Sequence, residues 1–223
     1  MRPEPLRRSA LVDRLADVLA ADGRAGRLRV AVDGPRVAGG AALAADLVGP
    51  LRTRGRPALR VSAWDFLRPA SLRFELGRDD PDAFYDSWFD VSALGREVLG
   101  PLGDGGTGEH PRALWDPVAD RAMRAARVSA PVDAVLLLDG PFLLRPELAW
   151  GFDSTIHLAL SPAARRRRVP AADARRELPA YDRYDAEVAP VETADLVVRL
   201  DDPARPALLD RRSGQETTRS WRR

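Results

Sequence analysis

The chain has 223 residues, of which 45% are hydrophobic and 30% are charged; this suffices for one α/β domain with a buried core and is short for two. There is no cysteine and there are only two histidines, which disfavours a disulfide framework, a thiol nucleophile and a histidine-rich metal site. All 35 residues counted as Lys or Arg are arginine, and a formal net charge of only +2 gives little reason to expect nucleic-acid binding.

The N-terminal segment predicts an amphipathic helix. Apolar residues recur at helical spacing from Leu6 to Ala21, and Asp13, Arg14 and Asp17 interrupt the apolar run that a signal peptide requires. No apolar run approaches the ~20 residues of a membrane-spanning helix. Since the absence of cysteine also fits a reducing compartment, we expect a cytoplasmic protein without a membrane partner.

The first predicted strand, Leu28 to Val32, leads into a glycine-rich loop with the sequence GPRVAGGA at 34–41 and then into a helix expected from Ala41 to Leu51. The glycine spacing is that of the phosphate-binding P-loop GxxxxGK[ST], whose backbone N–H groups cradle phosphates. Gly40 stands at the lysine position and Ala41 at the serine or threonine position. The loop therefore lacks the cation that reaches the phosphates and the hydroxyl that binds Mg²⁺, although its backbone can still bind an anion.

The remaining pattern predicts a parallel sheet with acidic residues at its carboxyl edge. Further strands are expected at 58–62, 134–138, 154–160 and 196–200, with helices at 91–99 and 162–178. Gly34, Asp65 and Asp139 each lie just past the end of a predicted strand, which is the edge where ligands of open α/β sheets bind. We therefore expect these three residues to border one crevice.

The order of these segments resembles the uridine kinase-like family of P-loop nucleoside kinases, from about Leu28 to Pro206. Each matching stretch is a modest signal, and the ordered set is more specific. Besides the loop, the resemblance is carried by VSAWDFLRP at 61–69, FYDSWFD at 84–90, VLLLDGPFLLRPEL at 135–148 and ADLVVRLDDPARP at 194–206.

This resemblance implies an α/β fold, a P-loop NTPase-like three-layer sandwich with a mostly parallel central sheet. It implies a single domain over residues 1–206, with an N-terminal helix in 1–22 and a lid-like helix in 161–180, followed by a basic tail over 207–223. The implied reaction is transfer of the γ-phosphate of ATP or GTP to the 5′ hydroxyl of a nucleoside, assisted by Mg²⁺.

Two acidic residues are candidates for the chemistry that the resemblance implies. The aspartate that accepts the nucleoside proton in the family aligns with Trp64, which leaves Asp65 as a fallback base; a helix or turn cap is an equally good interpretation of Asp65. Asp139 matches the acidic residue that holds Mg²⁺ in the family, directly or through water, whereas the alternative is a turn that ends the strand. With Ala41 unable to bind metal, such a site would be weakened.

The other candidates also have two interpretations. Arg165 and Arg168 begin the lid-like helix and would close over phosphates, unless they belong to a solvated helix face. The candidates near the nucleoside are Phe84, Tyr85, Asp90 and the weaker Arg112, although the aromatic residues are equally consistent with core positions. The nucleotide-binding candidates are Gly34, Pro35, Arg36, Val37, Ala38, Gly39, Gly40 and Ala41.

The sequence leaves several functions open. The first is a uridine kinase-like phosphotransferase homologue of low or no activity, with Mg²⁺ and ATP or GTP as cofactors if it is active. The alternative is a non-catalytic domain that binds a nucleotide, a nucleoside or a protein partner. Nucleic-acid binding rests on the arginines alone and has the least support.

Overall fold

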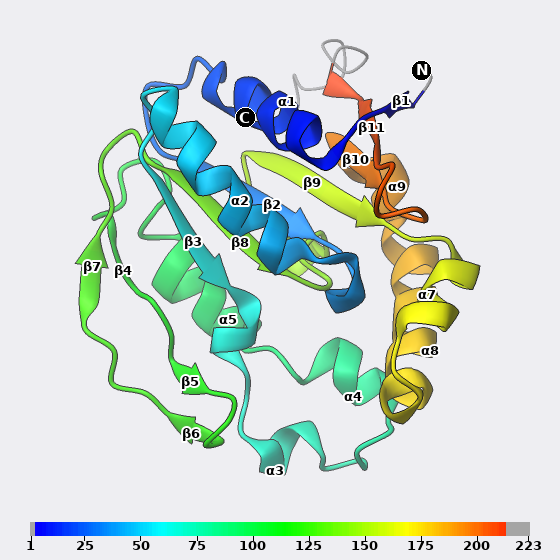
Figure 1. The fold of residues 1–223 in the computed structure, drawn as a ribbon. Helices are drawn as coiled ribbons and strands as arrows, with labels where there is room; N and C mark the ends of the chain where they lie inside the picture. The colour runs from blue at the N-terminus through cyan, green and yellow to red at the C-terminus, as the bar shows by residue number, and fades with distance from the viewer. Residues whose placement is uncertain (1–2, 213–223) are drawn as a thin grey trace.

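The computed structural model describes residues 3–212, in which a seven-stranded sheet lies between two layers of helices (Figure 1). This arrangement confirms the predicted three-layer α/β fold. The strands, in their order across the sheet, are β1 (Glu4–Pro5), β11 (Ala207–Asp210), β10 (Leu196–Arg199), β9 (Ser154–Ala159), β2 (Leu28–Asp33), β8 (Val135–Gly140) and β3 (Ala58–Ser62).

The five strands from β10 to β3 run parallel. At one edge β11 pairs antiparallel with β10, and β1 pairs antiparallel with β11. Strand β2 lies at the centre, between β8 and β9. Asp33 is in register with Gly140 on β8 and with His157 on β9, while Asp139 on β8 is in register with Ser62 on β3. The carboxyl ends of these strands therefore meet at one edge of the sheet, as the sequence predicted.

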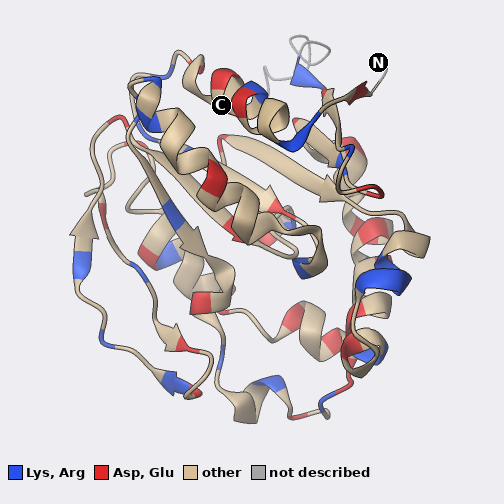
Figure 2. Ribbon diagram, in the orientation of Figure 1, with Lys and Arg blue, Asp and Glu red and all other residues tan. Residues whose placement is uncertain are grey.

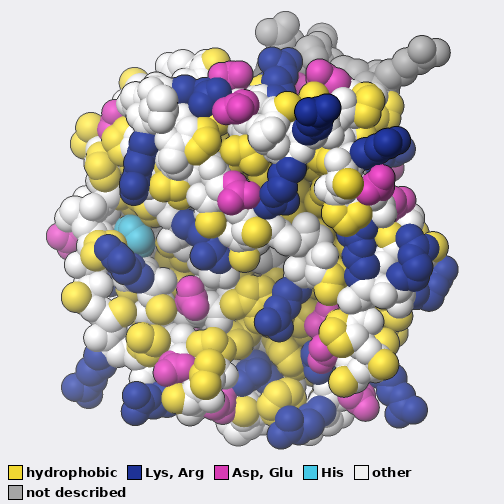
Figure 3. Space-filling model, viewed as in Figure 1, with side chains coloured by type: hydrophobic (Ala, Val, Ile, Leu, Met, Phe, Trp, Pro, Cys, Tyr) yellow, Lys and Arg dark blue, Asp and Glu magenta, His cyan; other side chains and the backbone are white. Residues whose placement is uncertain are grey.

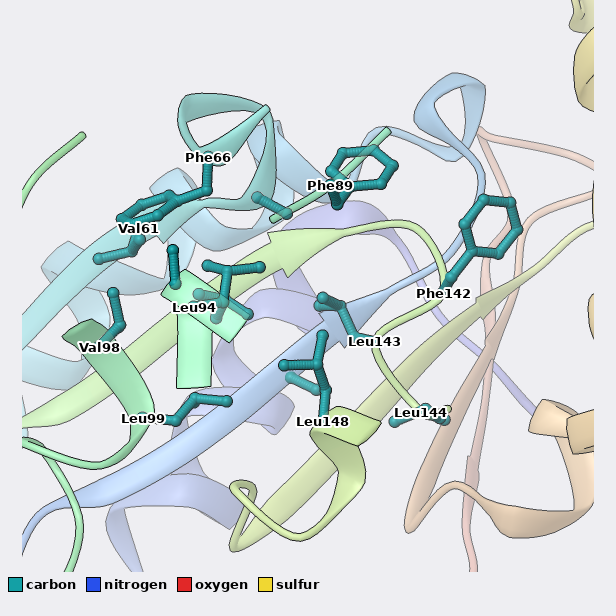
Figure 4. Close-up of a cluster of buried hydrophobic side chains, with 14 of the residues drawn as sticks. Val61, Phe66, Phe89, Leu94, Val98, Leu99, Phe142, Leu143, Leu144 and Leu148 are labelled. Carbon is teal, nitrogen blue, oxygen red and sulfur yellow. The ribbon is translucent and has the colours of Figure 1, made fainter. Parts of the chain in front are cut away.

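Each face of the sheet buries its own apolar cluster. Along β8, Val135 and Leu137 pack on the face that is covered by α1 (Arg8–Ala20) and α2 (Gly40–Thr53). The alternate residues Leu136 and Leu138 pack on the other face. Figure 4 shows part of the cluster on this second face, including Phe66, Leu94 and Phe142. This alternation follows from the two-residue period of a strand. The second face is covered by α4 (Pro81–Asp86), α5 (Val91–Ala93), the π-helical turn η3 (Leu94–Leu99), α6 (Pro146–Ala149) and α8 (Ala171–Val188).

Short elements complete the described chain. The 3-10 turn η1 (Arg36–Ala38) lies within the glycine loop, and η2 (Ala63–Phe66) follows β3. Two small antiparallel pairs lie outside the seven-stranded sheet. The other elements are α3 (Ala70–Arg73), α7 (Pro162–Arg168), α9 (Pro190–Thr193), β4 (Glu109–Pro111) with β7 (Arg127–Ser129), and β5 (Trp115–Asp116) with β6 (Arg121–Ala122).

Three sequence expectations need correction. The helix expected at 162–178 is two helices, because Val169 is extended in front of Pro170 and α8 begins only after that proline. The helix expected to stop near Pro50 continues to Thr53. The segment predicted as a tail from residue 207 begins with β11, which pairs with β10; residues 213–223 of that prediction lie outside the described residues.

The single-domain boundaries remain a prediction. Within residues 3–212, no helix has both the length and the apolar character needed to cross a membrane.

Candidate functional site

The glycine loop has the backbone that its sequence demands. Gly34 has φ of +145°, and a Cβ atom at this position would lie 2.8 Å from the carbonyl oxygen of Leu158. Gly39 is left-handed, with φ of +81°, and its carbonyl accepts the hydrogen bond from Leu43 N–H that begins α2. Both conformations favour glycine, so the two framework glycines of the P-loop pattern are structurally required.

Gly40 is different, because the structure has room for a side chain there. A Cβ atom at Gly40 would lie 3.4 Å from the carbonyl oxygen of Val32, which is an ordinary contact. Ala41 is exposed at the start of α2. Contacts of a Cβ atom therefore do not require glycine at residue 40, and residue 41 is exposed enough for a hydroxyl.

The loop borders a cavity of about 390 Å³ at the carboxyl edge of the sheet. Three predicted site regions meet there: the loop, the residues after β3 and the end of β8. Basic and acidic side chains border a hollow in the middle of the face shown in Figure 3. The cavity is lined by Gly34, Pro35, Arg36, Gly40, Ala41, Arg60, Ser62, Trp64, Asp65, Pro117, Asp139 and Gly140.

Asp139 is buried at the cavity floor, and both of its carboxylate oxygens have partners. Arg60 Nε donates to Oδ1 over 2.6 Å, and Ser62 Oγ donates to Oδ2 over 2.9 Å. The side chain of Asp139 is 2% exposed, whereas that of Arg60 is 35% exposed. A guanidinium group therefore already neutralises the carboxylate that the resemblance assigned to Mg²⁺.

These residues do not fit a magnesium site. Mg²⁺ requires oxygen ligands in octahedral geometry, and here the carboxylate is engaged by Arg60 while Ala41 offers no hydroxyl. Within residues 3–212, no group of three or more acidic or histidine side chains is placed to hold a metal ion.

Asp65 lies on η2 and lines the same cavity. Burial raises the pKa of its carboxyl group; the nearby Arg60 lowers this pKa, and the charge of Asp139 raises it further. A carboxylate with a raised pKa is a better proton acceptor. The structure thus brings Asp65 and Asp139 together beside the loop, as the sequence predicted.

Trp64, which aligns with the family's base, contacts the glycine loop instead. The guanidinium carbon of Arg36 lies 5.3 Å from the centre of its ring, within the range of a cation–π interaction. The Trp64 ring also packs against the core, edge-on to Phe89, with 5.1 Å between the two ring centres. Trp64 therefore holds an arginine of the loop over the cavity.

The two predicted lid arginines do not line the cavity. Arg165 is buried and forms ion pairs with Asp182 and Asp185 of α8, at 3.0 and 2.6 Å. Arg168 donates hydrogen bonds to the backbone carbonyls of Leu200 and Asp201. Figure 2 shows the basic residues of α7 beside acidic residues of α8. In this structure both arginines attach α7 to its neighbours.

The nucleoside-side candidates lie outside the cavity lining as well. Phe84 is fully buried among other aromatic rings. The hydroxyl of Tyr85 donates to Glu187 over 3.0 Å, and burial, with this bond, raises its pKa to about 12. Asp90 caps α5 by accepting from Ala93 N–H, and Arg112 is exposed after β4. The placements of Phe84 and Tyr85 match their core interpretation, whereas the sequence did not predict that Asp90 caps a helix.

Sequence reasoning missed a buried network behind the loop. Asp33, the last residue of β2, is 0% exposed and accepts hydrogen bonds from Leu143 N–H at 2.9 Å and Tyr184 OH at 3.0 Å. His157 Nδ1 lies 2.6 Å from Asp33 Oδ2; because a carboxylate only accepts, Nδ1 carries the hydrogen. A charged residue ending an apolar strand and a histidine inside another were the available signals.

Comparison with solved structures finds related folds. A structure described as a possible uridine kinase from Bacillus stearothermophilus matches with a TM-score of 0.72 and 22% identity, over 85% of this chain and 97% of that chain. A proposed fructose transport system kinase from Silicibacter matches with a TM-score of 0.60 and 22% identity, over 78% and 94% of the two chains. No protein-family model matches the sequence, and no curated protein does.

At these identities the likeness concerns the fold. The similarity spans nearly the whole length of both compared chains. This chain itself has the order of strand, glycine loop and helix that begins a P-loop domain. The protein therefore has a uridine kinase-like fold of the P-loop kinase type.

Proposed function

We propose that this protein binds the phosphate groups of a nucleotide, ATP or GTP, in the cavity at the glycine loop, and that it transfers phosphate slowly or not at all. P-loop kinases in general use a nucleotide with Mg²⁺, and the resemblance adds a nucleoside 5′ hydroxyl as the ancestral acceptor. We further propose a cytoplasmic location, in line with the composition.

One observation carries the proposal: the loop backbone is kept while the groups that act on phosphate are replaced. Gly34 and Gly39 hold the loop conformation, and α2 still begins at its end. Lysine, the metal-binding hydroxyl and the aligned base are replaced by Gly40, Ala41 and Trp64. Loss of one preorganised donor costs ~2.7 to 4 kcal/mol of transition-state stabilisation in other enzymes, and such losses are not additive.

The proposal is tested by measuring binding and transfer separately. Calorimetric titration with ATP should detect binding, while transfer of radiolabelled phosphate from ATP to uridine or cytidine should stay near background. Turnover comparable to that of an ordinary P-loop kinase would contradict the proposal, and so would the absence of any ATP or GTP binding.

A matched pair of variants locates the binding site. Gly40→Asp places a negative charge at the phosphate position, and the structure has room for its Cβ atom. Gly49→Asp adds the same charge on the same helix, at an exposed position with nothing within 4 Å of a Cβ atom. The first variant should lose ATP binding and the second should keep it, because only the first faces the cavity.

A second candidate function is slow nucleoside phosphorylation with Asp65 as the base. It is favoured by the position of Asp65 in the cavity and by the burial that raises its pKa. If background transfer is measurable, Asp65→Asn should abolish it without weakening ATP binding. Transfer that persists unchanged in this variant would eliminate Asp65 as the base.

A further inference from the structure

The unexpected member of the cavity is Arg60, which belongs to the parallel strand β3 and reaches the end of β8. Its Nε bonds to Asp139, 79 positions away in the chain. An arginine has five N–H donors, so this bond leaves the terminal amino groups of Arg60 available to a ligand. The side chain is also partly exposed in the cavity, whereas its acidic partner is buried.

The ion pair fixes where this positive charge sits. Asp139 holds the Nε edge of the guanidinium, and Ser62 holds the other oxygen of Asp139. A group held in this way loses less freedom when it binds a ligand, and the planar guanidinium suits the oxygens of phosphate. The ion pair therefore fixes the orientation of the Arg60 guanidinium in a cavity whose loop lacks lysine.

Arg36 adds a second guanidinium on the loop side. It is exposed, and Trp64 lies beneath it at 5.3 Å. Both arginines line the cavity together with the start of α2. The cavity lining thus combines two arginines and a helix N-terminus with two carboxylates, Asp65 and Asp139, of which Asp139 is already paired with Arg60. Guanidinium groups and the N–H groups of a helix start are the donors that suit a polyphosphate.

We propose that the cavity binds the polyphosphate of a nucleotide without a divalent metal, and that Arg60 supplies the positive charge that lysine and Mg²⁺ supply in ordinary P-loops. This inference rests on the proposed function and adds its metal independence. Asp139 positions Arg60 and is not a metal ligand. Added Mg²⁺ should then weaken ATP binding, because it competes with Arg60 for the same phosphate oxygens.

The test is an ATP titration by calorimetry, in EDTA and again in excess Mg²⁺. We expect ATP to bind in EDTA and to bind more weakly with Mg²⁺. Arg60→Met should lower the affinity in EDTA by about tenfold or more, the loss of one charge-assisted contact. Arg127→Met is the control, since Arg127 pairs with Glu97 on the surface outside the cavity and is 45% exposed; it should leave the affinity unchanged.

Asp139→Asn separates the two roles of the carboxylate. It removes a negative charge beside the ligand while keeping an oxygen that accepts from Arg60, so the affinity for ATP in EDTA should rise. In a metal site the same change would lower the affinity measured with Mg²⁺. Arg60→Lys checks for folding effects, because it keeps the charge and should retain part of the binding that Arg60→Met loses.

The outcomes are distinguishable. Binding that requires Mg²⁺, a weaker Asp139→Asn variant, or an unchanged Arg60→Met variant would overturn the inference and leave nucleotide binding standing. If ATP and GTP bind under neither condition, the proposed function fails together with it.

Discussion

Two buried aspartates lie at the carboxyl ends of neighbouring strands, Asp33 as the last residue of β2 and Asp139 as the penultimate residue of β8, and their surroundings differ. Asp33 on β2 is bound by a backbone N–H, a tyrosine hydroxyl and a histidine, and it does not line the cavity. Asp139 on β8 is bound by Ser62 and by an arginine that reaches the cavity. Both aspartates are almost completely buried and lie in adjacent strands. Asp33 has a closed environment, without access to the cavity, whereas Asp139 has an open one that borders the cavity.

The difference separates a structural role from a ligand-binding role. Every partner of Asp33 is buried, so its bonds cannot be exchanged for water or ligand. These bonds tie the end of β2 to β9, to α8 and to the segment after β8, and so they fix the start of the glycine loop. Asp139 has a partner with solvent access, so its ion pair can respond to a bound anion.

The largest effect is expected from Asp33→Ala. This change leaves buried donors on Leu143, Tyr184 and His157 without an acceptor, and each such donor costs ~1 to 3 kcal/mol. We expect the free energy of unfolding to fall by about 3 to 5 kcal/mol, measured by urea denaturation.

Asp139→Ala is the matched comparison. Ser62 and Arg60 can be hydrated from the cavity, so a loss of only about 1 to 2 kcal/mol is expected. Equal losses of unfolding free energy in Asp33→Ala and Asp139→Ala would contradict the distinction between the closed site of Asp33 and the open site of Asp139.

An effect of intermediate size, on the affinity for ATP, is expected from restoring the P-loop side chains. Gly40→Lys combined with Ala41→Thr adds a cation and a hydroxyl where the structure has room for them, and ATP binding should strengthen by about tenfold. Gly49→Lys adds the same charge to α2 away from the cavity and should have little effect. Calorimetry measures the affinities. An unchanged affinity in the double variant would mean that the loop does not face the phosphates.

Local patterns predicted the positions at the sheet edge but not their partners. An apolar run ending in Asp139, and a glycine loop between a strand and a helix, place these residues from sequence alone. The pairing of Asp139 with Arg60 depends on which strands become neighbours, and nothing local to either residue specifies it. The same limit explains why Asp33 and His157 were missed.

Expectations taken from the resemblance fared differently from those taken from the residues. Arg165 was expected at the phosphates, but the break at Val169 and Pro170 lets α7 fold back onto α8, where acidic residues face it. Strand β11, the second strand from one edge of the sheet, was missed because a four-residue strand beside charged residues carries little periodic signal. The position of Arg165 thus depends on its ion pairs with Asp182 and Asp185. Strand β11 depends on its pairing with β10.

The smallest expected effect is on the pH dependence of stability and concerns Asp65, which lines the same cavity as Asp139. Burial raises its pKa, so the folded protein holds this proton more tightly than the unfolded chain does. Stability from this group is therefore lost as the pH rises from its ordinary pKa of about 3.9 through the raised value. Asp65→Asn should be slightly more stable than the parent protein at pH 7, and this gain should vanish in acid. Thermal unfolding across this pH range measures the difference.

Asp116 gives the control of opposite sign. Hydrogen bonds from the backbone N–H groups of Ala119 and Val118 lower its pKa, so its contribution is present at neutral pH and is lost as the pH falls through the lowered value. Asp116→Asn should therefore be less stable at pH 7, with the loss vanishing in acid. A loss of stability at pH 7 in Asp65→Asn as well would contradict this expectation. It would mean that Arg60 stabilises the Asp65 carboxylate more than burial destabilises it. The cavity would then be more positive than the ion pair between Arg60 and Asp139 implies.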